Sequence, residues 1–358
     1  MADSPLPVVY DGGSDLSLSE QDIFDIDTFD VDSQDSRSDY DYNTSGWFNE
    51  HYPLSPLESM KNSLGLGIEC HPDLEPSDIE QFTFDILNEY LSPSSSTSPM
   101  DAAWQFNNGL PFNSPDVESE EMESIDCLLG EIWDLVFRLA QQIPHNHPSQ
   151  ERFVQFILAL RDLPVDIKVS IGKDPDHLWH DLPMLDFGME MWLHRIPTDH
   201  IFTDDNTRQR WQNYNSFVAR LVRDGVYVGL HSAALCCISV LCSALEDEPD
   251  PRSKAYKAYG PELDVFLPIA AEWILLAGKK VYSLSKANYS AGFYGNRGKN
   301  FKGPVGFSVE RWNFWKGRFE AVSNHHKVKD ETRLLATQAL EAMHTAEESI
   351  ASDVLPIL

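Results

Sequence analysis

The charge of this 358-residue chain is divided very unevenly along its length. Residues 1–124 contain 27 Asp or Glu and two bases, a net charge of −25, whereas the other 234 residues contain 30 acids and 25 bases, a net charge of −5. A strongly acidic segment repels itself and buries too little apolar surface to order, while about 230 residues with balanced charge suffice for one large core. The sequence therefore predicts a disordered acidic arm, residues 1–121, before a globular domain, residues 122–350.

Helical periodicity dominates the globular part. From Ser124 onward apolar residues recur at helical spacing, and Pro or Asp marks the junctions between segments. No segment shows strict alternation, so we expect no strand. The predicted fold class is all-α, a single multi-helix domain of about seven or eight helices. The expected helices carry Ile125–Leu139, Phe153–Leu160, Leu185–Trp192, Trp211–Leu221, Val226–Leu245, Glu262 to about Leu284, a helix after Ser308, and Leu334–Met343.

The stretch 306–319 is the most distinctive of these segments, because it holds two Trp and three Phe. Ser308 is a suitable N-cap for a helix that begins there. Trp312, Trp315 and Phe319 fall on one stripe of that helix, which we expect to face the core. The structural core motif expected from these patterns comprises Trp273, Phe307, Ser308, Trp312, Trp315 and Phe319.

The opposite face of the same helix places Phe314 between Arg311 and Arg318. An aromatic ring between two guanidinium groups is one form of stacking platform for a ligand or a partner. The alternative is a helix buried on both sides, with its charges paired to neighbouring helices.

The acidic arm contains two motifs that suggest partner docking. Residues 22–32 alternate acids with apolar residues, among them Phe24 and Phe29, a composition typical of disordered partner-docking segments and equally of a simple spacer. Ser77 and Glu80 form a capping box for a helix of about 14 residues, over 78–91. Its apolar face comprises Ile79, Phe82, Ile86 and Tyr90.

This helix over 78–91 is too short to be stable alone in water. It therefore folds when it docks, either on a partner or back on the protein's own domain, and the sequence leaves both open.

A glycine-rich loop before the aromatic helix holds three bases, Arg297, Lys299 and Lys302. These bases make it a candidate anion-binding loop. It is not a P-loop, because the glycine spacing fails, Asn300 stands where Ser or Thr is needed, and no strand is expected before it. The simpler interpretation is that the glycines let the chain turn.

No recognisable catalytic or metal-binding motif is present. The closest histidine pairs lack further ligands at zinc spacing, and there is no G-x-S-x-G elbow. His180 and Asp181 form a possible acid–base pair, but Asp181 fits better as a helix N-cap before Pro183. We therefore assign no catalytic residue, no metal and no cofactor.

The net charge, the apolar runs and the cysteine content also bear on the partners and the cellular location of the protein. The acidity disfavours direct nucleic-acid binding and adsorption to anionic membranes. Val226–Leu245 has 20 residues without formal charge, but its internal polar residues and charged ends favour a buried core helix over a membrane span. Five cysteines, three of them in this apolar run, are typical of reduced thiols in a cytoplasmic or nuclear protein. The N-terminus does not read as a secretory signal.

One set of motifs resembles a known family. The pattern G-F-S-x-E-R-W-x-F-W at 306–315, the segment 273–278, the run 179–183 and the run 211–217 are similar to a family of filamentous-fungal proteins known as a domain of unknown function. The resemblance covers roughly residues 122–348 and implies an intracellular all-helical protein, with no catalytic residues to carry over.

These observations lead us to expect a non-enzymatic interaction or regulatory protein. Its helical domain would dock a protein partner, and its acidic arm would recruit a second partner or shield the first. One alternative is a small-molecule-binding or enzymatic domain with a pocket near Trp312, Trp315 and the glycine-rich loop. Another is a transcriptional co-regulator that uses the acidic-aromatic arm.

Overall fold

The computed structural model describes residues 66, 68–70, 75–110, 125–169, 171, 176–195, 204–226, 230–246, 260–290 and 298–353. All of them belong to one compact unit, which spans residues 53–358. Phe24, Phe29 and Arg297 lie outside the described residues, so the interpretations placed on them remain predictions.

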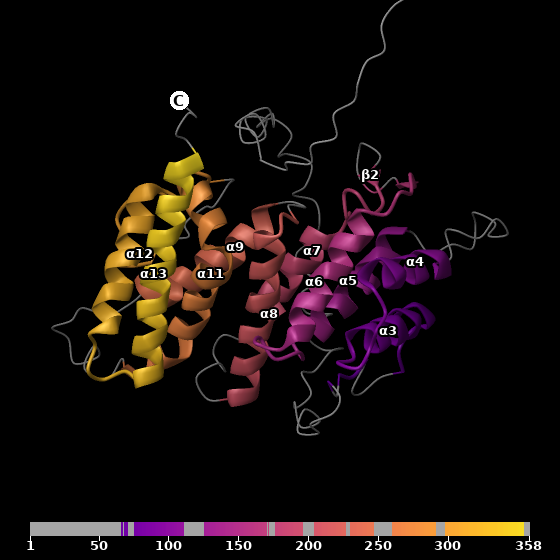
Figure 1. Ribbon diagram of the computed structural model, residues 1–358, viewed down its shortest axis with the longest axis horizontal. Coiled ribbons are helices and arrows are strands. Elements are labelled where there is room, and N and C mark those ends of the chain that lie inside the picture. Colours follow the sequence, from indigo (N-terminus) through magenta and orange to yellow (C-terminus); the bar gives the residue numbers. More distant parts are fainter. Residues whose placement is uncertain are drawn as a thin grey trace, which may run out of the picture. The chain divides into compact units, whose positions relative to one another are not determined.

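The described part of the chain is almost entirely helical, which confirms the all-α class (Figure 1). Its helices are α3 (Asp78–Leu91), α4 (Pro99–Gly109), α5 (Ile125–Ala140), α6 (Pro148–Arg161), α7 (Leu185–Arg195), α8 (Asp205–Arg223), α9 (Leu230–Leu241), the π-helical turn η6 (Cys242–Glu246), α11 (Gly260–Lys286), α12 (Val309–Ser323) and α13 (Asp330–Asp353).

The helices pack as two groups joined by a central pair. On one side α3 packs on α4, α5 and α6, α4 packs on α6, and α5 packs on α7. On the other side α11, α12 and α13 lie side by side (Figure 1). Helices α8 and α9 join the groups, since α8 contacts α5, α6, α9 and α11, and α9 contacts α7 and α11. The buried apolar residues form one continuous core through both groups.

Local capping signals locate several helix ends correctly. Ser77 accepts a hydrogen bond from the Glu80 amide and completes the predicted capping box, so α3 begins at Asp78. Ser308 accepts from the Arg311 amide, so α12 begins at Val309. The apolar run 226–245 becomes α9 followed by η6, whose described side chains are mostly buried. Among the described residues, no helix combines the length and the apolar character needed to cross a bilayer.

Three features differ from the sequence expectations. Helix α4 was not expected, although Ser98 as N-cap and Pro99 at the first helical position are its signals. A two-residue antiparallel ladder joins β1 (Lys168–Val169) to β2 (Asp176–His177), so the expectation of no strand is wrong at this point. Asp181 does not cap α7; its carboxylate accepts from the His177 amide, and α7 begins four residues later, at Leu185.

The compact unit also begins earlier than the predicted boundary at residue 122. Helices α3 and α4 pack against α5 and α6, so the helix over 78–91 docks on the protein's own domain. Tyr90 is buried in this contact, while Ile79, Phe82 and Ile86 are partly buried and pack against the core.

Candidate functional site

The surface on which α3 and α4 dock is built from two helices and one tryptophan. We call it the docking face and define it by Arg138 of α5, Ser149, Arg152 and Phe156 of α6, and Trp179. The part of the chain that covers it, residues 75–110, is the docked segment. The candidate site is this face, because each of these five side chains contacts the docked segment directly.

Arg138 joins the docked segment to α5 by charge. Its guanidinium forms an ion pair with Glu80 at 3.0 Å, donates to the Cys70 carbonyl at 3.1 Å, and pairs with Asp134 one turn earlier on α5. The Arg138 and Glu80 side chains are only 7% and 9% exposed. Burial alone would lower the pKa of Arg138, but the two carboxylates raise it above its ordinary value, so Arg138 is cationic.

The Cys70 thiol beside the Arg138–Glu80 pair is expected to be unreactive. Burial first, and then the Glu80 carboxylate, raise the pKa of Cys70 to about 11. A thiol with such a pKa is a poor nucleophile at neutral pH.

Arg152 and Ser149 cap the end of α3. The guanidinium of Arg152 donates to the Tyr90 carbonyl at 2.7 Å and to the Thr97 carbonyl at 3.3 Å, and it lies 4.6 Å from the centre of the Tyr90 ring. The Ser149 hydroxyl donates to the Leu91 carbonyl at 2.7 Å. The last carbonyls of a helix have no partner within it. Here α6 supplies those partners, so α6 recognises the end of a helix.

Phe106 is the apolar anchor of the docked segment. It is fully buried, and its ring centre lies 5.6 Å from Phe156 and 5.8 Å from Trp179, with Phe82 stacked on it at 6.0 Å. The Trp179 indole donates to the side-chain oxygen of Asn107 at 2.7 Å. A buried indole N–H needs such an acceptor, so Asn107 fixes the register of α4 on the docking face.

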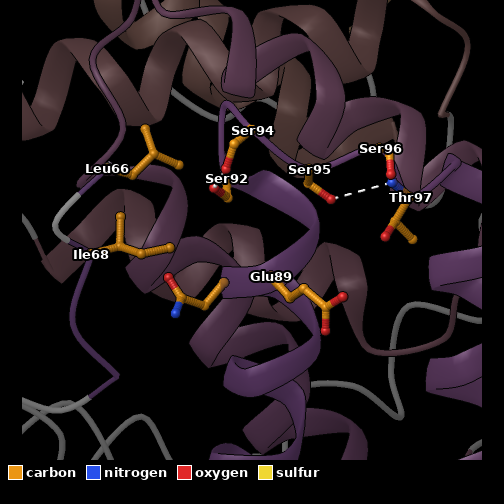
Figure 2. A pocket seen from close by; sticks show the side chains of 9 residues that line it. Leu66, Ile68, Glu89, Ser92, Ser94, Ser95, Ser96 and Thr97 are labelled. Atoms are coloured by element: carbon orange, nitrogen blue, oxygen red, sulfur yellow. Dashed lines mark hydrogen bonds between the residues drawn. The ribbon is translucent and has the colours of Figure 1, made fainter. Parts of the chain in front are cut away.

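A cavity of about 680 Å³ adjoins the docked segment (Figure 2). Its lining is rich in hydroxyl groups from the loop between α3 and α4, and the Thr97 amide donates to the Ser95 hydroxyl at 3.3 Å within it. The lining residues are Leu66, Ile68, Asn88, Glu89, Ser92, Ser94, Ser95, Ser96 and Thr97.

The stacking platform expected around Phe314 does not include Arg311. Arg311 is fully buried and forms an ion pair with Glu246 of η6 at 2.7 Å, while Phe314 contacts Phe301 with ring centres 5.4 Å apart. The Trp315 indole donates to the same Glu246 carboxylate at 2.6 Å. The physical reason is that η6 presents a buried carboxylate, and the nearby guanidinium compensates its charge.

The glycine-rich loop also serves this buried pair. The Gly298 amide donates to Glu246 at 2.8 Å, and a Cβ on Gly298 would lie 2.2 Å from the Glu246 Cβ. Gly306 has φ +76° and its carbonyl accepts from Arg311 at 2.8 Å. Gly298 is therefore explained by close approach to Glu246, and Gly306 by its positive φ and by the Tyr289 carbonyl, which would lie 2.5 Å from a Cβ there.

Among the described residues, Lys299, Lys302 and Arg318 are not seen to share one anion site. Lys299 and Lys302 are exposed, and the Lys302 ammonium donates to the Lys299 carbonyl at 2.5 Å. Arg318 is partly buried, and burial lowers its pKa. Trp312 and Trp315 are fully buried together with Trp273, Phe307 and Phe319, so neither indole lines a site open to solvent.

The polar cluster around Glu272 lacks the geometry of a nucleophile and its base. Glu272 accepts from His145 at 3.0 Å, Ser216 at 2.6 Å and Gln212 at 3.2 Å; burial would raise its pKa, but these contacts lower it below the ordinary value. The Ser216 hydroxyl bonds to the Glu272 carboxylate and to the His145 backbone carbonyl, and not to the His145 imidazole, so the two side chains are not a nucleophile with its base. Within the described ranges, no group of three or more His, Cys, Asp or Glu is placed to hold a metal ion.

The fold and the docking face define an all-α protein that carries a helical segment docked on its own core. The chain belongs to a family described as "Protein of unknown function (DUF3632)", whose family model matches residues 133–319. No curated protein and no solved structure matches the chain. The matched region is shorter than the range 122–348 suggested by the resemblance. It contains the whole docking face, but neither the docked segment nor α13.

Proposed function

We propose that this protein is a non-enzymatic interaction protein whose docking face binds an amphipathic helix of a partner protein. The observation that carries the proposal is the division between family core and docked segment. Arg138, Arg152, Phe156 and Trp179 all lie within residues 133–319, whereas the helices that cover them lie before it. A family core that carries a helix-binding surface supports a docking function, and the docked segment shields this surface until a partner competes.

The contacts of the docked segment define the chemistry of the partner. Arg138 selects a carboxylate, as Glu80 provides in cis. Phe156 and Trp179 select an aromatic anchor, and Arg152 with Ser149 selects the carbonyl end of a helix. The proposed partner therefore offers an acidic amphipathic helix with at least one buried Phe, Tyr or Trp.

The acidic arm and the cysteine content extend the proposal to a second partner and to the cellular location. Residues 22–32, with Phe24 and Phe29, recruit a second protein through their acid–aromatic pattern. The resemblance to a filamentous-fungal family and the reduced character expected of the cysteines support a role inside a fungal cell, in the cytoplasm or the nucleus.

The test measures binding of a fluorescent peptide, Glu75–Leu110, to the full-length chain by anisotropy. In the wild type the docked segment competes in cis at high effective concentration, so the peptide binds weakly. The Phe106→Ala variant loses the apolar anchor in cis, and we expect it to bind the peptide at least about tenfold more tightly. The matched control is Phe187→Ala, because Phe187 is 45% exposed and is not part of the docking face.

Two further measurements make the result decisive. A peptide carrying both Glu80→Gln and Phe106→Ala should lose most of its affinity for the Phe106→Ala chain, because it lacks both anchors. Thermal unfolding verifies that each chain is folded. Equal peptide affinity for the wild type and the folded Phe106→Ala chain would refute the docking function.

A further inference from the structure

The loop that joins α3 to α4 has an unusual concentration of hydroxyl groups. Residues 91–99 read Leu-Ser-Pro-Ser-Ser-Ser-Thr-Ser-Pro, so six of nine side chains carry a hydroxyl and two serines precede proline. Ser94 and Ser96 are exposed, and Ser92 and Ser98 are partly exposed. The hydroxyl-lined cavity of Figure 2 lies along this loop. The loop therefore presents serine side chains to solvent beside the docking face.

Both Ser-Pro serines have the same extended backbone. Ser92 has φ −54° and ψ 134°, and Ser98 has φ −73° and ψ 156°. The following proline disfavours helical conformation at each serine and holds the backbone in the β or polyproline II region. Such a segment presents the serine hydroxyl and the proline ring together to an enzyme that binds extended substrates.

The two serines differ in how their hydroxyls are engaged. Ser98 caps α4: its hydroxyl accepts from the Asp101 amide at 3.1 Å and donates to the Asp101 carboxylate at 2.7 Å. Ser92 is the C-cap residue of α3, and its hydroxyl contacts the Ser94 hydroxyl at 3.0 Å. Modification of Ser98 would first break a helix cap, whereas the hydroxyl of Ser92 contacts only another loop hydroxyl among the contacts seen in the described residues.

Charge makes Ser92 a poor place for an anion in the docked state. It follows the last turn of α3, where the helix dipole is negative, and that turn contains Glu89 and no base. Glu89 also lines the cavity beside Ser92. Arg152, the cation of the docking face that contacts the chain on both sides of Ser92, already donates to the Tyr90 and Thr97 carbonyls. A phosphate that paired with Arg152 would withdraw donors from the carbonyls that hold α3 in place.

We infer that Ser92 is a phosphoacceptor site for a proline-directed protein kinase, and that its phosphorylation releases the docked segment from the docking face. This inference rests on the proposed function, since it supplies the event that exposes the surface. The phosphate adds close to two negative charges at the end of α3, next to Glu89. Like-charge repulsion and the helix dipole then both disfavour the docked helix.

The chemical step uses a nucleoside triphosphate as the phosphoryl donor. The bond between its γ-phosphorus and the β–γ bridging oxygen breaks, and a bond forms between that phosphorus and Ser92 Oγ. The hydroxyl proton passes to a base of the kinase, and nucleoside diphosphate leaves. No oxidant or metal bound to this protein is required.

The experiment treats the full-length chain with a purified proline-directed Ser/Thr kinase and ATP, and locates phosphate by mass spectrometry. Hydrogen–deuterium exchange of the α3 amides then reports release. We expect phosphate on Ser92 and at least about fivefold faster exchange in residues 78–91, with α12 unchanged. Ser92→Ala should abolish the change, whereas Ser94→Ala, in the same loop but not before proline, should leave it intact.

Two glutamate variants that mimic the phosphate charge make the test independent of how completely the kinase modifies the chain. Ser92→Glu should speed α3 exchange and Ser94→Glu should do so less, because Ser94 lies outside the helix cap. Absence of phosphate on Ser92, or phosphate there without faster α3 exchange, would overturn the inference. Release of α3 without binding of the Glu75–Leu110 peptide would instead support the switch and reject the docking function.

Discussion

Among the described residues, two buried arginine–glutamate pairs hold distant parts of the chain together, and they differ in how fully they are shielded from solvent. In the pair Arg311–Glu246 both side chains are 0% exposed, and one carboxylate serves the guanidinium, the Trp315 indole and the Gly298 amide. In the pair Arg138–Glu80 the side chains are 7% and 9% exposed, and Arg138 has a second carboxylate, Asp134, on its own helix. The first joins parts of the family core, and the second joins that core to the docked segment.

This difference separates a structural clamp from a contact suited to release. Removal of Glu246 would leave the Arg311 charge buried without its carboxylate, which is among the most costly changes in a protein interior. Departure of Glu80 leaves Arg138 paired with Asp134, so the docking face keeps a compensated charge after the docked segment leaves. The same residue types thus produce permanent or reversible contacts, according to whether the arginine keeps a local carboxylate.

The largest expected effect on stability comes from breaking the Arg311–Glu246 pair. Glu246→Ala should lower the free energy of unfolding by about 3–5 kcal/mol, because it strands the buried Arg311 charge and removes the acceptor of the Trp315 indole. Urea denaturation of the full-length chain measures this change. Glu320→Ala is the matched control: Glu320 is exposed on α12, and its substitution should change stability by less than about 0.5 kcal/mol.

A double variant sharpens the interpretation of that result. Glu246→Leu combined with Arg311→Met replaces the buried charges by apolar groups and should recover most of the lost stability. If the double variant is as unstable as Glu246→Ala, loss of packing and not the unpaired charge explains the effect.

A smaller and more local loss of stability is expected when the Arg138–Glu80 pair is weakened. Glu80→Gln should weaken docking of residues 75–110 by about 1.5 kcal/mol, because a charge-assisted hydrogen bond to Arg138 becomes a neutral one. Hydrogen exchange should accelerate in α3 and α4 and stay unchanged in α12. Asp85→Asn, on the exposed face of the same helix, serves as control. A loss of global stability equal to that of Glu246→Ala would erase the distinction between the two pairs.

The smallest effect concerns the end of α3. Arg152→Lys keeps the charge but loses the planar fork that reaches both the Tyr90 and Thr97 carbonyls, and should weaken docking by about 1 kcal/mol. The readout is exchange of the last α3 amides. Arg161→Lys, on the same α6 but bonded to the Gly225 carbonyl, should leave α3 exchange at its wild-type rate. Equal rates for Arg152→Lys and the wild type would show that Arg152 does not hold the helix end.

Local signals predicted much of the fold but little of the site. The capping box at Ser77 and the N-cap at Ser308 act within one helical turn, so the sequence locates α3 and α12 correctly. The contacts of Arg138 and Arg152 with the docked segment join residues 55 or more positions apart, and no spacing rule indicates them. For the same reason the sequence left two interpretations of Arg311 open, and its pairing with Glu246, 65 residues distant, corresponds to the buried and charge-paired alternative.

By itself the sequence determined the all-α class, most helix positions and the amphipathic character of residues 78–91, because helix periodicity and capping depend on neighbours within one or two turns. Only the tertiary structure decided that these residues cover α5 and α6, that η6 directs Glu246 toward Arg311, and that Phe106 fills the space beside Phe156 and Trp179. Those outcomes depend on which distant charges and rings meet, and burial strengthens such contacts only after the chain has closed around them.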